Sequence, residues 1–121
     1  IHPEIALISL KLFDDGHYSQ ATFEALKLID KRVETLSGIE ETGRSLMMAA
    51  FKESDPKIAL NALKTTSELN EQEGYKFLFA GSIVGIRNPR GHEVNKKDGL
   101  ADCLDHLSLA SHLMRVLDSR V

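Results

Sequence analysis

The sequence has a single cysteine, Cys103, among its 121 residues. An intramolecular disulfide and a zinc site built from several cysteines are therefore excluded. No apolar run approaches the roughly 18–20 residues needed to cross a bilayer, and the first residues lack the basic-then-apolar layout of a signal peptide. We therefore expect a soluble, cytoplasmic protein that does not enter a membrane.

The sequence also lacks a large excess of either charge. It has 15 Lys and Arg against 18 Asp and Glu, which gives a net charge of −3. This balance argues against a generally basic nucleic-acid binder, and any basic site must be local. The length, with 42% apolar and 27% charged residues, is typical of one globular domain. We expect residues 1–121 to form that single domain, and the start at Ile1 rather than Met predicts that it is the C-terminal part of a longer protein.

Proline is scarce, with three residues at positions 3, 56 and 89, so most of the chain is free to be helical. Apolar residues recur at three- and four-residue steps, and little of the sequence alternates as a strand would. The pattern predicts an all-α, single-domain bundle of five or six helices without strands.

The first half of the sequence marks three helices. Pro3 suits the first turn of a helix that stops at residues 14–16. A long amphipathic stripe runs from Phe23 to Leu36 and ends at Ser37-Gly38. Thr42 can cap a third, shorter helix that closes at residues 54–56.

The second half is expected to supply the centre of the bundle. Residues 57–68 predict a short helix and a mobile loop, and Asn70 with Glu73 predicts the start of a helix that is apolar nearly all round until Ile86. Asp98 can cap the last helix. Its predicted buried stripe is Leu100, Leu104, Leu107, Ser111 and Met114. The helix ending at Ile86 must lie centrally or in a subunit contact, and we expect it to pair with this last helix.

The most informative segment is residues 87–97. Pro89 disfavours helical geometry at the preceding residue, and Gly91 frees the backbone just before His92, so we expect a bend that presents polar groups. Basic residues gather there beside His92, in a chain that is otherwise acidic: Arg87, Arg90, Lys96 and Lys97. The segment therefore predicts a local anion site.

Arginine and histidine together can cleave RNA without a metal. Arg87 would grip the phosphate and stabilise its developing charge, His92 would move the proton, and Asn88 would orient the phosphate or the histidine. One histidine cannot easily act as base and acid at once, so a symmetric dimer is the attractive arrangement. The alternative is structural, because an arginine followed by Asn-Pro is also an ordinary stop at the end of a helix.

The pattern Arg87-Asn88-x-x-x-His92 resembles the motif of the HEPN superfamily of nucleotide-binding domains. More specifically, the chain resembles the uncharacterised Ymh-type family within that superfamily. The matching segments span nearly the whole chain and lie at residues 12–18, 23–27, 74–81 and 87–93. The resemblance implies a helical bundle that dimerises and, in many members, a metal-independent endoribonuclease of toxin, phage-defence or RNA-processing systems.

The resemblance implies roles for individual residues. Arg87, Asn88 and His92 occupy the catalytic positions of the motif, and Glu24 matches an acidic supporting residue on an earlier helix, with a solvated helical glutamate as the alternative. Pro89 and Gly91 match the Ymh-type spacer but not the spacer of every HEPN nuclease. From their charge, substrate contacts are expected for Arg90, Lys96 and Lys97.

The leading expectation is therefore a homodimeric endoribonuclease with RNA as substrate and an antitoxin or other protein as a further partner. It would use no cofactor and no metal. His106 and His112 lie six residues apart, on different faces of the last helix, which argues against a metal-binding pair. Two alternatives stay open: a non-enzymatic module that binds RNA, a nucleotide or a protein, and a dimerisation domain for a preceding region.

Overall fold

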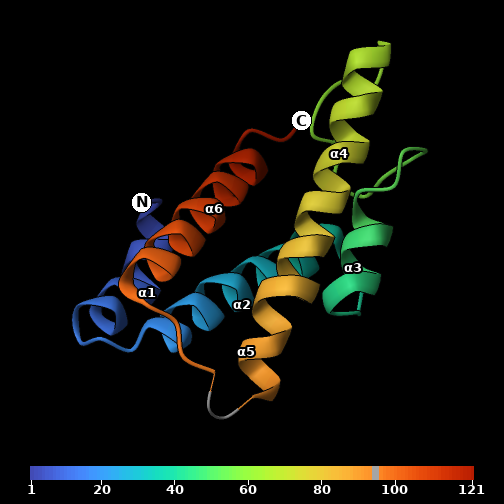
Figure 1. Cartoon of the computed structure of the whole chain (residues 1–121). Helices are drawn as coiled ribbons and strands as arrows, with labels where there is room; N and C mark the ends of the chain where they lie inside the picture. Colours follow the sequence, from blue (N-terminus) through green and yellow to red (C-terminus); the bar gives the residue numbers. More distant parts are fainter. Residues whose placement is uncertain (94–95) are drawn as a thin grey trace.

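The computed structural model describes residues 1–93 and 96–121, which form helices and connecting segments (Figure 1). The elements are α1 (Pro3–Asp14), α2 (Tyr18–Ser37), α3 (Gly43–Ala50), α4 (Thr66–Ser82), a π-helical turn η1 (Ile83–Arg87), α5 (Asn88–His92) and α6 (Leu100–Asp118). Within these two ranges there is no strand, which confirms the predicted all-α fold. No helix described there has the length and apolar character needed to span a membrane.

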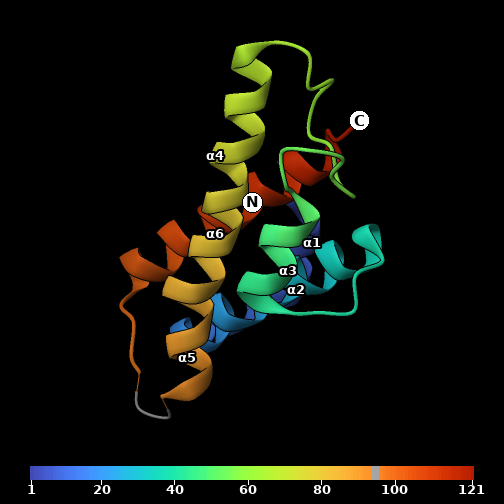
Figure 2. The ribbon, with the colours of Figure 1, turned by 90° about the vertical axis from the view of Figure 1, so that its right-hand side faces the viewer.

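Helix α2 is the centre of the molecule. It packs against α1 and α6 on one side and against α3, η1 and α5 on the other (Figures 1 and 2). Three of its fully buried apolar residues are Leu26, Ile29 and Val33, spaced three and four residues apart as a buried helix stripe requires. The prediction that the helix ending at Ile86 and the last helix form the centre is therefore wrong, because α4 packs mainly against α3 and η1, whereas α6 packs against α1 and α2.

The predicted start and end of α1 and the predicted end of α2 are confirmed, but α3 ends at Ala50, before the predicted close at residues 54–56. Pro3 occupies the first turn of α1, where its missing N–H costs no hydrogen bond. Gly38 ends α2 in the left-handed conformation, with φ of 71°. Thr42 precedes α3 but makes no side-chain cap; instead the buried carboxylate of Asp30 accepts the Gly43 N–H at 2.8 Å.

Helix α4 begins four residues earlier than Asn70, the predicted start. Thr65 and Glu68 form a reciprocal capping box, in which each side chain accepts a hydrogen bond from the other residue's backbone N–H. The short helix predicted within residues 57–68 does not form. Gln72 accounts for this, because its buried side chain bonds the carbonyls of Phe51 and Ile58 and the N–H of Leu60, and so holds this irregular segment against α4.

Helices α4 and α5 form one continuous rod through η1, and only part of its surface is buried (Figure 2). Phe79 and Ile83 are fully buried, and Phe79 stacks on Phe51 at 4.5 Å between ring centroids. Away from this core the rod exposes about half of each of three side chains: Phe77 and Val84, which line a groove with Arg44 and Met48 of α3, and Leu78 on another face. On α6, Leu100 and Leu104 are also exposed, so its buried stripe begins at Cys103 rather than at Leu100 as predicted.

Replacing Gln72 by Ala should destabilise the protein by about 2–4 kcal/mol. The change leaves two carbonyls and one N–H without their buried hydrogen-bond partner. Urea denaturation measures this loss, with Gln20→Ala on the exposed surface of α2 as the matched control. Equal stability of the two variants would contradict the role assigned to Gln72.

Candidate active site

The Arg87–His92 segment is helical, so the predicted bend is wrong. Proline has no N–H and its ring clashes with the carbonyl four residues before it in an α-helix. The chain meets this constraint with the π turn of η1, in which the Asn88 N–H bonds the carbonyl of Ile83, five residues back. The helix then continues through Pro89 and ends after His92.

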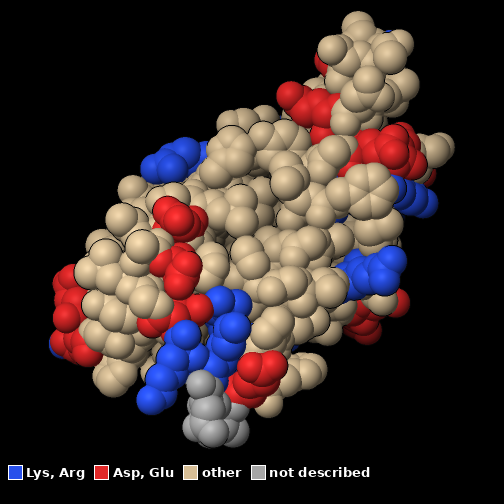
Figure 3. Space-filling view, viewed as in Figure 1, with Lys and Arg blue, Asp and Glu red and all other residues tan. Residues whose placement is uncertain are grey.

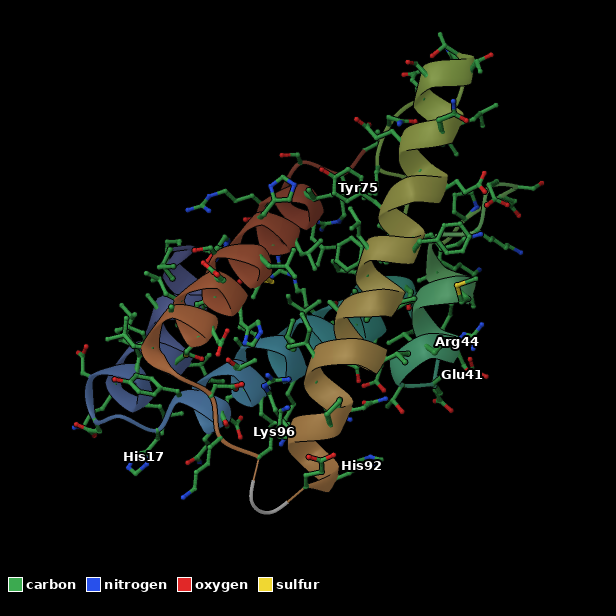
Figure 4. The ribbon with its side chains drawn as sticks, in the orientation of Figure 1. His17, Glu41, Arg44, Tyr75, His92 and Lys96 are labelled. Carbon is green, nitrogen blue, oxygen red and sulfur yellow. The ribbon has the colours of Figure 1, made fainter. Side chains whose placement is uncertain are left out.

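Because the segment is helical, Arg87 and His92 point in different directions. Five residues of α-helix turn through roughly 500°, which leaves the two side chains about 140° apart around the axis. Arg87 lies toward α2, whereas His92 is exposed at the free end of α5 (Figure 4). One chain therefore does not bring the two predicted catalytic residues to one point.

The guanidinium of Arg87 lies over the ring of Phe23, with 5.1 Å between Cζ and the ring centroid. Its Nη1 donates to the Oδ1 of the predicted supporting residue Asn88 at 3.2 Å. Nε is buried and has no hydrogen-bond partner among the described residues, and no described carboxylate lies within salt-bridge distance. Arg87 thus combines an uncompensated charge with unused donors.

Gly91 is required by the same contact. A Cβ at this position would lie 2.8 Å from Cε1 of Phe23, which is closer than carbon atoms tolerate. Gly91 and Arg87 are four residues apart and so share the helix face that meets Phe23. The ring of Phe23 therefore fixes how α5 lies on α2.

Arg90, predicted to bind substrate, is held in a buried ion pair. Its Nε and Nη2 donate to the two carboxylate oxygens of Asp98 at 2.7 and 2.6 Å, and its Nη1 donates to the carbonyl of Ile86. The side chains of Arg90 and Asp98 are 8% and 5% exposed. Ser19 also donates to Asp98, and the Arg90 guanidinium holds the pKa of this carboxyl below its ordinary value.

Asp98 therefore does not cap α6 as predicted; Gly99 is the N-cap residue. The physical reason is that the buried guanidinium of Arg90 requires a carboxylate, and Asp98 is the one within reach. Sequence reasoning missed this pairing, because the signal it had, an acidic residue shortly before an apolar helix, is shared by ordinary helix caps.

Lys96 and Lys97 line a hollow of about 340 Å³ together with His17 and the first turn of α2. Figure 3 shows basic side chains gathered where α5 ends and α6 begins, and Figure 4 shows Lys96 and His92 on opposite sides of the end of α5. The two predicted substrate-binding lysines thus face a concave surface beside the motif.

The last predicted site residue, Glu24, is half-buried on α2 next to Phe23 and forms no ion pair within the described ranges.

Two residues earlier on α2, Thr22 bonds Nδ1 of His106 at 3.1 Å and donates to the thiol of the buried Cys103. Burial raises the pKa of the Cys103 thiol, and burial together with Arg90 lowers the pKa of His106. Both side chains are therefore kept neutral, which suits a structural role.

Comparison with known proteins gives one family. Residues 1–117 match the model of a family described as "Protein of unknown function (Hypoth_ymh)". The chain belongs to this family. No curated protein and no solved structure matches it. The matched residues include the segment from Arg87 to His92 and every helix, α6 as far as residue 117.

Within the described ranges no three His, Cys, Asp or Glu side chains are grouped to hold a metal ion.

Replacing Asp98 by Asn should destabilise the protein by about 3 kcal/mol at pH 7, because Arg90 is left buried without its counter-charge. The folded-state pKa of Asp98 is depressed, so its contribution is present above the unfolded value of about 3.9 and is lost as the pH falls through the folded value. The difference between wild type and variant should therefore shrink below about pH 4. Urea denaturation at pH 7 and pH 3 measures it.

The matched control is Asp15→Asn, which breaks the exposed pair of Asp15 with Lys11. Exposed pairs contribute little, so this variant should stay close to wild type at both pH values. If Asp98→Asn behaves like Asp15→Asn, the Arg90–Asp98 pair does not hold α5 in place.

Proposed function

We propose that this chain is a metal-independent endoribonuclease that works as a homodimer, with Arg87 and His92 catalytic and Asn88 supporting. The observation that carries the proposal is the state of Arg87. Its guanidinium is held half-buried on Phe23, with Nε unpartnered and no described carboxylate beside it. Such a group favours an anion, because its positive charge is uncompensated; the anion would meet the outer nitrogens of the fork, since Nε itself is buried.

The chemistry follows from the two residue types. His92 would remove the proton from a ribose 2′-hydroxyl, and the resulting oxygen would attack the adjacent phosphorus and expel the 5′-oxygen of the next nucleotide. The leaving oxygen takes a proton from a second histidine. Arg87 would stabilise the charge that develops on the phosphate oxygens, because its planar fork matches them. Asn88 would orient Arg87 through their hydrogen bond.

Two copies are needed because one copy separates the two residues around the α5 axis. A two-fold axis at the free ends of the two α5 helices would gather the His92 side chains of both chains around one phosphate, so that one histidine acts as base and the other as acid. Exposed apolar side chains favour such a contact, with Phe77, Leu78 and Val84 on the rod. Figure 3 shows that the surface between α6 and the rod carries little charge.

RNA binding would use the hollow lined by Lys96 and Lys97. Flexible lysines contact phosphates as point charges and position the strand without reading its sequence. Arg90 contributes indirectly, because its ion pair with Asp98 fixes the backbone next to Lys97. Glu24, beside Phe23, remains a candidate for positioning the phosphate-binding arginine.

The motif resemblance extends the proposal to biological setting. Because many HEPN proteins are toxins or phage-defence effectors, the resemblance supports such a role for this chain, with a cognate antitoxin as partner. The cytoplasmic location stays part of the proposal. The rival proposal is a binding module without catalysis. If the protein does not dimerise, the separation of about 140° between Arg87 and His92 favours this rival, because one chain alone does not bring both residues to one phosphate.

Wild-type protein should cleave single-stranded RNA in the presence of EDTA and leave 2′,3′-cyclic phosphate ends. His92→Ala and Arg87→Ala should each reduce the rate by ~10²–10⁴, the usual cost of losing a proton-transfer or charge-stabilising group. DNA and RNA methylated at the 2′-oxygen should remain intact, because they lack the attacking nucleophile. Gel assays with end-labelled RNA measure all of these rates.

The controls for this assay are His112→Ala and Arg44→Ala, which remove the same residue types from exposed positions elsewhere. Both should cleave like wild type. Loss of cleavage in EDTA, or equal cleavage by wild type and both motif variants, would overturn the proposed chemistry. RNA binding without cleavage, lost in Arg87→Ala, would establish the rival binding module.

Light scattering should give the wild-type protein twice the 13.4 kDa mass of one chain at micromolar concentration. Leu78→Asp should produce a folded monomer, because a charge would be buried at the contact. The matched control is Leu7→Asp on α1, where the leucine is also exposed, and it should remain a dimer. A wild-type monomer would contradict both the dimer and the shared site.

A further inference from the structure

A second pocket lies at the end of the α4–α5 rod opposite His92, in the angle between α4 and α6 (Figure 4). Its volume is about 250 Å³, smaller than the ~300–1,000 Å³ typical of sites for drug-sized molecules. Glu71 and Tyr75 of α4 form one wall, and His112 and Arg115 of α6 form the other. The proposed RNA chemistry uses none of these residues.

Fixed contacts hold the walls of this pocket in place. The phenol of Tyr75 and Nε2 of His112 are hydrogen-bonded at 2.7 Å, which joins α4 to α6. Gln72 fixes the segment that carries Leu60, and the backbone N–H of Val121 bonds the carbonyl of Ala59. The pocket is therefore formed before any ligand arrives, which reduces the entropic cost of binding.

The pocket carries two opposite charges that do not pair with each other. Arg115 forms no ion pair within the described ranges, and the carboxylate of Glu71 is contacted only by the side-chain amide of Asn61, at 2.9 Å. The same pocket is also lined by the ring of Tyr75 and by the apolar side chains of Leu60 and Val116. Such a pocket is complementary to a molecule that carries an anionic group, a cationic group and an apolar body.

We propose that this pocket binds a small zwitterion with an apolar body, of the class of an apolar amino acid. Its carboxylate would meet the guanidinium of Arg115, and its ammonium group would meet the carboxylate of Glu71. Its side chain would lie against Leu60, Val116 and the Tyr75 ring. A simple anion fits less well, because Glu71 repels it, and a simple cation is repelled by Arg115.

The test follows the ring resonances of the histidines by NMR while phenylalanine is added to the whole chain without RNA. Five histidines give five signals, and His112→Gln identifies the one at the pocket. Phenylalanine should shift the His112 signal saturably, and the signals of His17 and His92 should stay in place. Two half-probes, 3-phenylpropionate without the amine and phenethylamine without the acid, should each bind at least roughly tenfold more weakly.

Arg115→Gln and Glu71→Gln should each weaken phenylalanine binding by roughly tenfold or more, whereas the matched control Arg44→Gln should not. The glutamine at position 71 can still accept the hydrogen bond from Asn61, so the wall remains in place. An unmoved His112 signal with all three probes overturns the pocket as a ligand site. Equal binding of phenylalanine and 3-phenylpropionate overturns the zwitterion assignment. Neither result depends on ribonuclease activity.

Discussion

The buried ion pair between Arg90 and Asp98 is the constraint on which the motif region depends. It joins three elements, because Arg90 lies in α5, Asp98 lies just before α6, and Ser19 of α2 donates to the same carboxylate. Two charges this deeply buried tolerate little displacement, since separating them leaves each without compensation. The end of the rod is therefore fixed on α2, and the backbone that carries Lys96 and Lys97 is fixed with it.

Pro89 determines how the motif is displayed. A proline usually ends a helix, because it has no N–H to donate and its ring clashes with a preceding carbonyl. Here the wider π turn of η1 accommodates the ring, and the helix continues. The consequence is a separation of Arg87 and His92 around one axis rather than their convergence in a bend. A catalytic site that uses both residues must then be completed by another surface, and this is why dimerisation and catalysis are one hypothesis in this chain.

Features set by local sequence were predictable, and features set by distant contacts were not. The start of α1 follows from Pro3 and the end of α2 from Gly38, whose effects act within one helical turn, whereas the start of α3 depends on the distant carboxylate of Asp30. The start of α4 is also encoded locally, in the capping box of Thr65 and Glu68, but Asn70 and Glu73 offer the same spacing five residues later and predict the wrong start. The segment before α4 depends on Gln72, and no spacing rule indicates which backbone groups a buried glutamine will bond.

Arg87 and Arg90 show why residue type alone does not assign a site. Both lie on one helical segment, three residues apart, and both are predicted to contact the substrate, Arg87 as a motif residue and Arg90 from its charge alone. The neighbour decides between them: Asp98 neutralises Arg90, whereas Phe23 supports Arg87 with its ring face and leaves the positive charge uncompensated. Phosphate binding requires a positive charge that no carboxylate of the protein already neutralises, so within this pair Arg87 is the candidate for an anion site and Arg90 has a structural role.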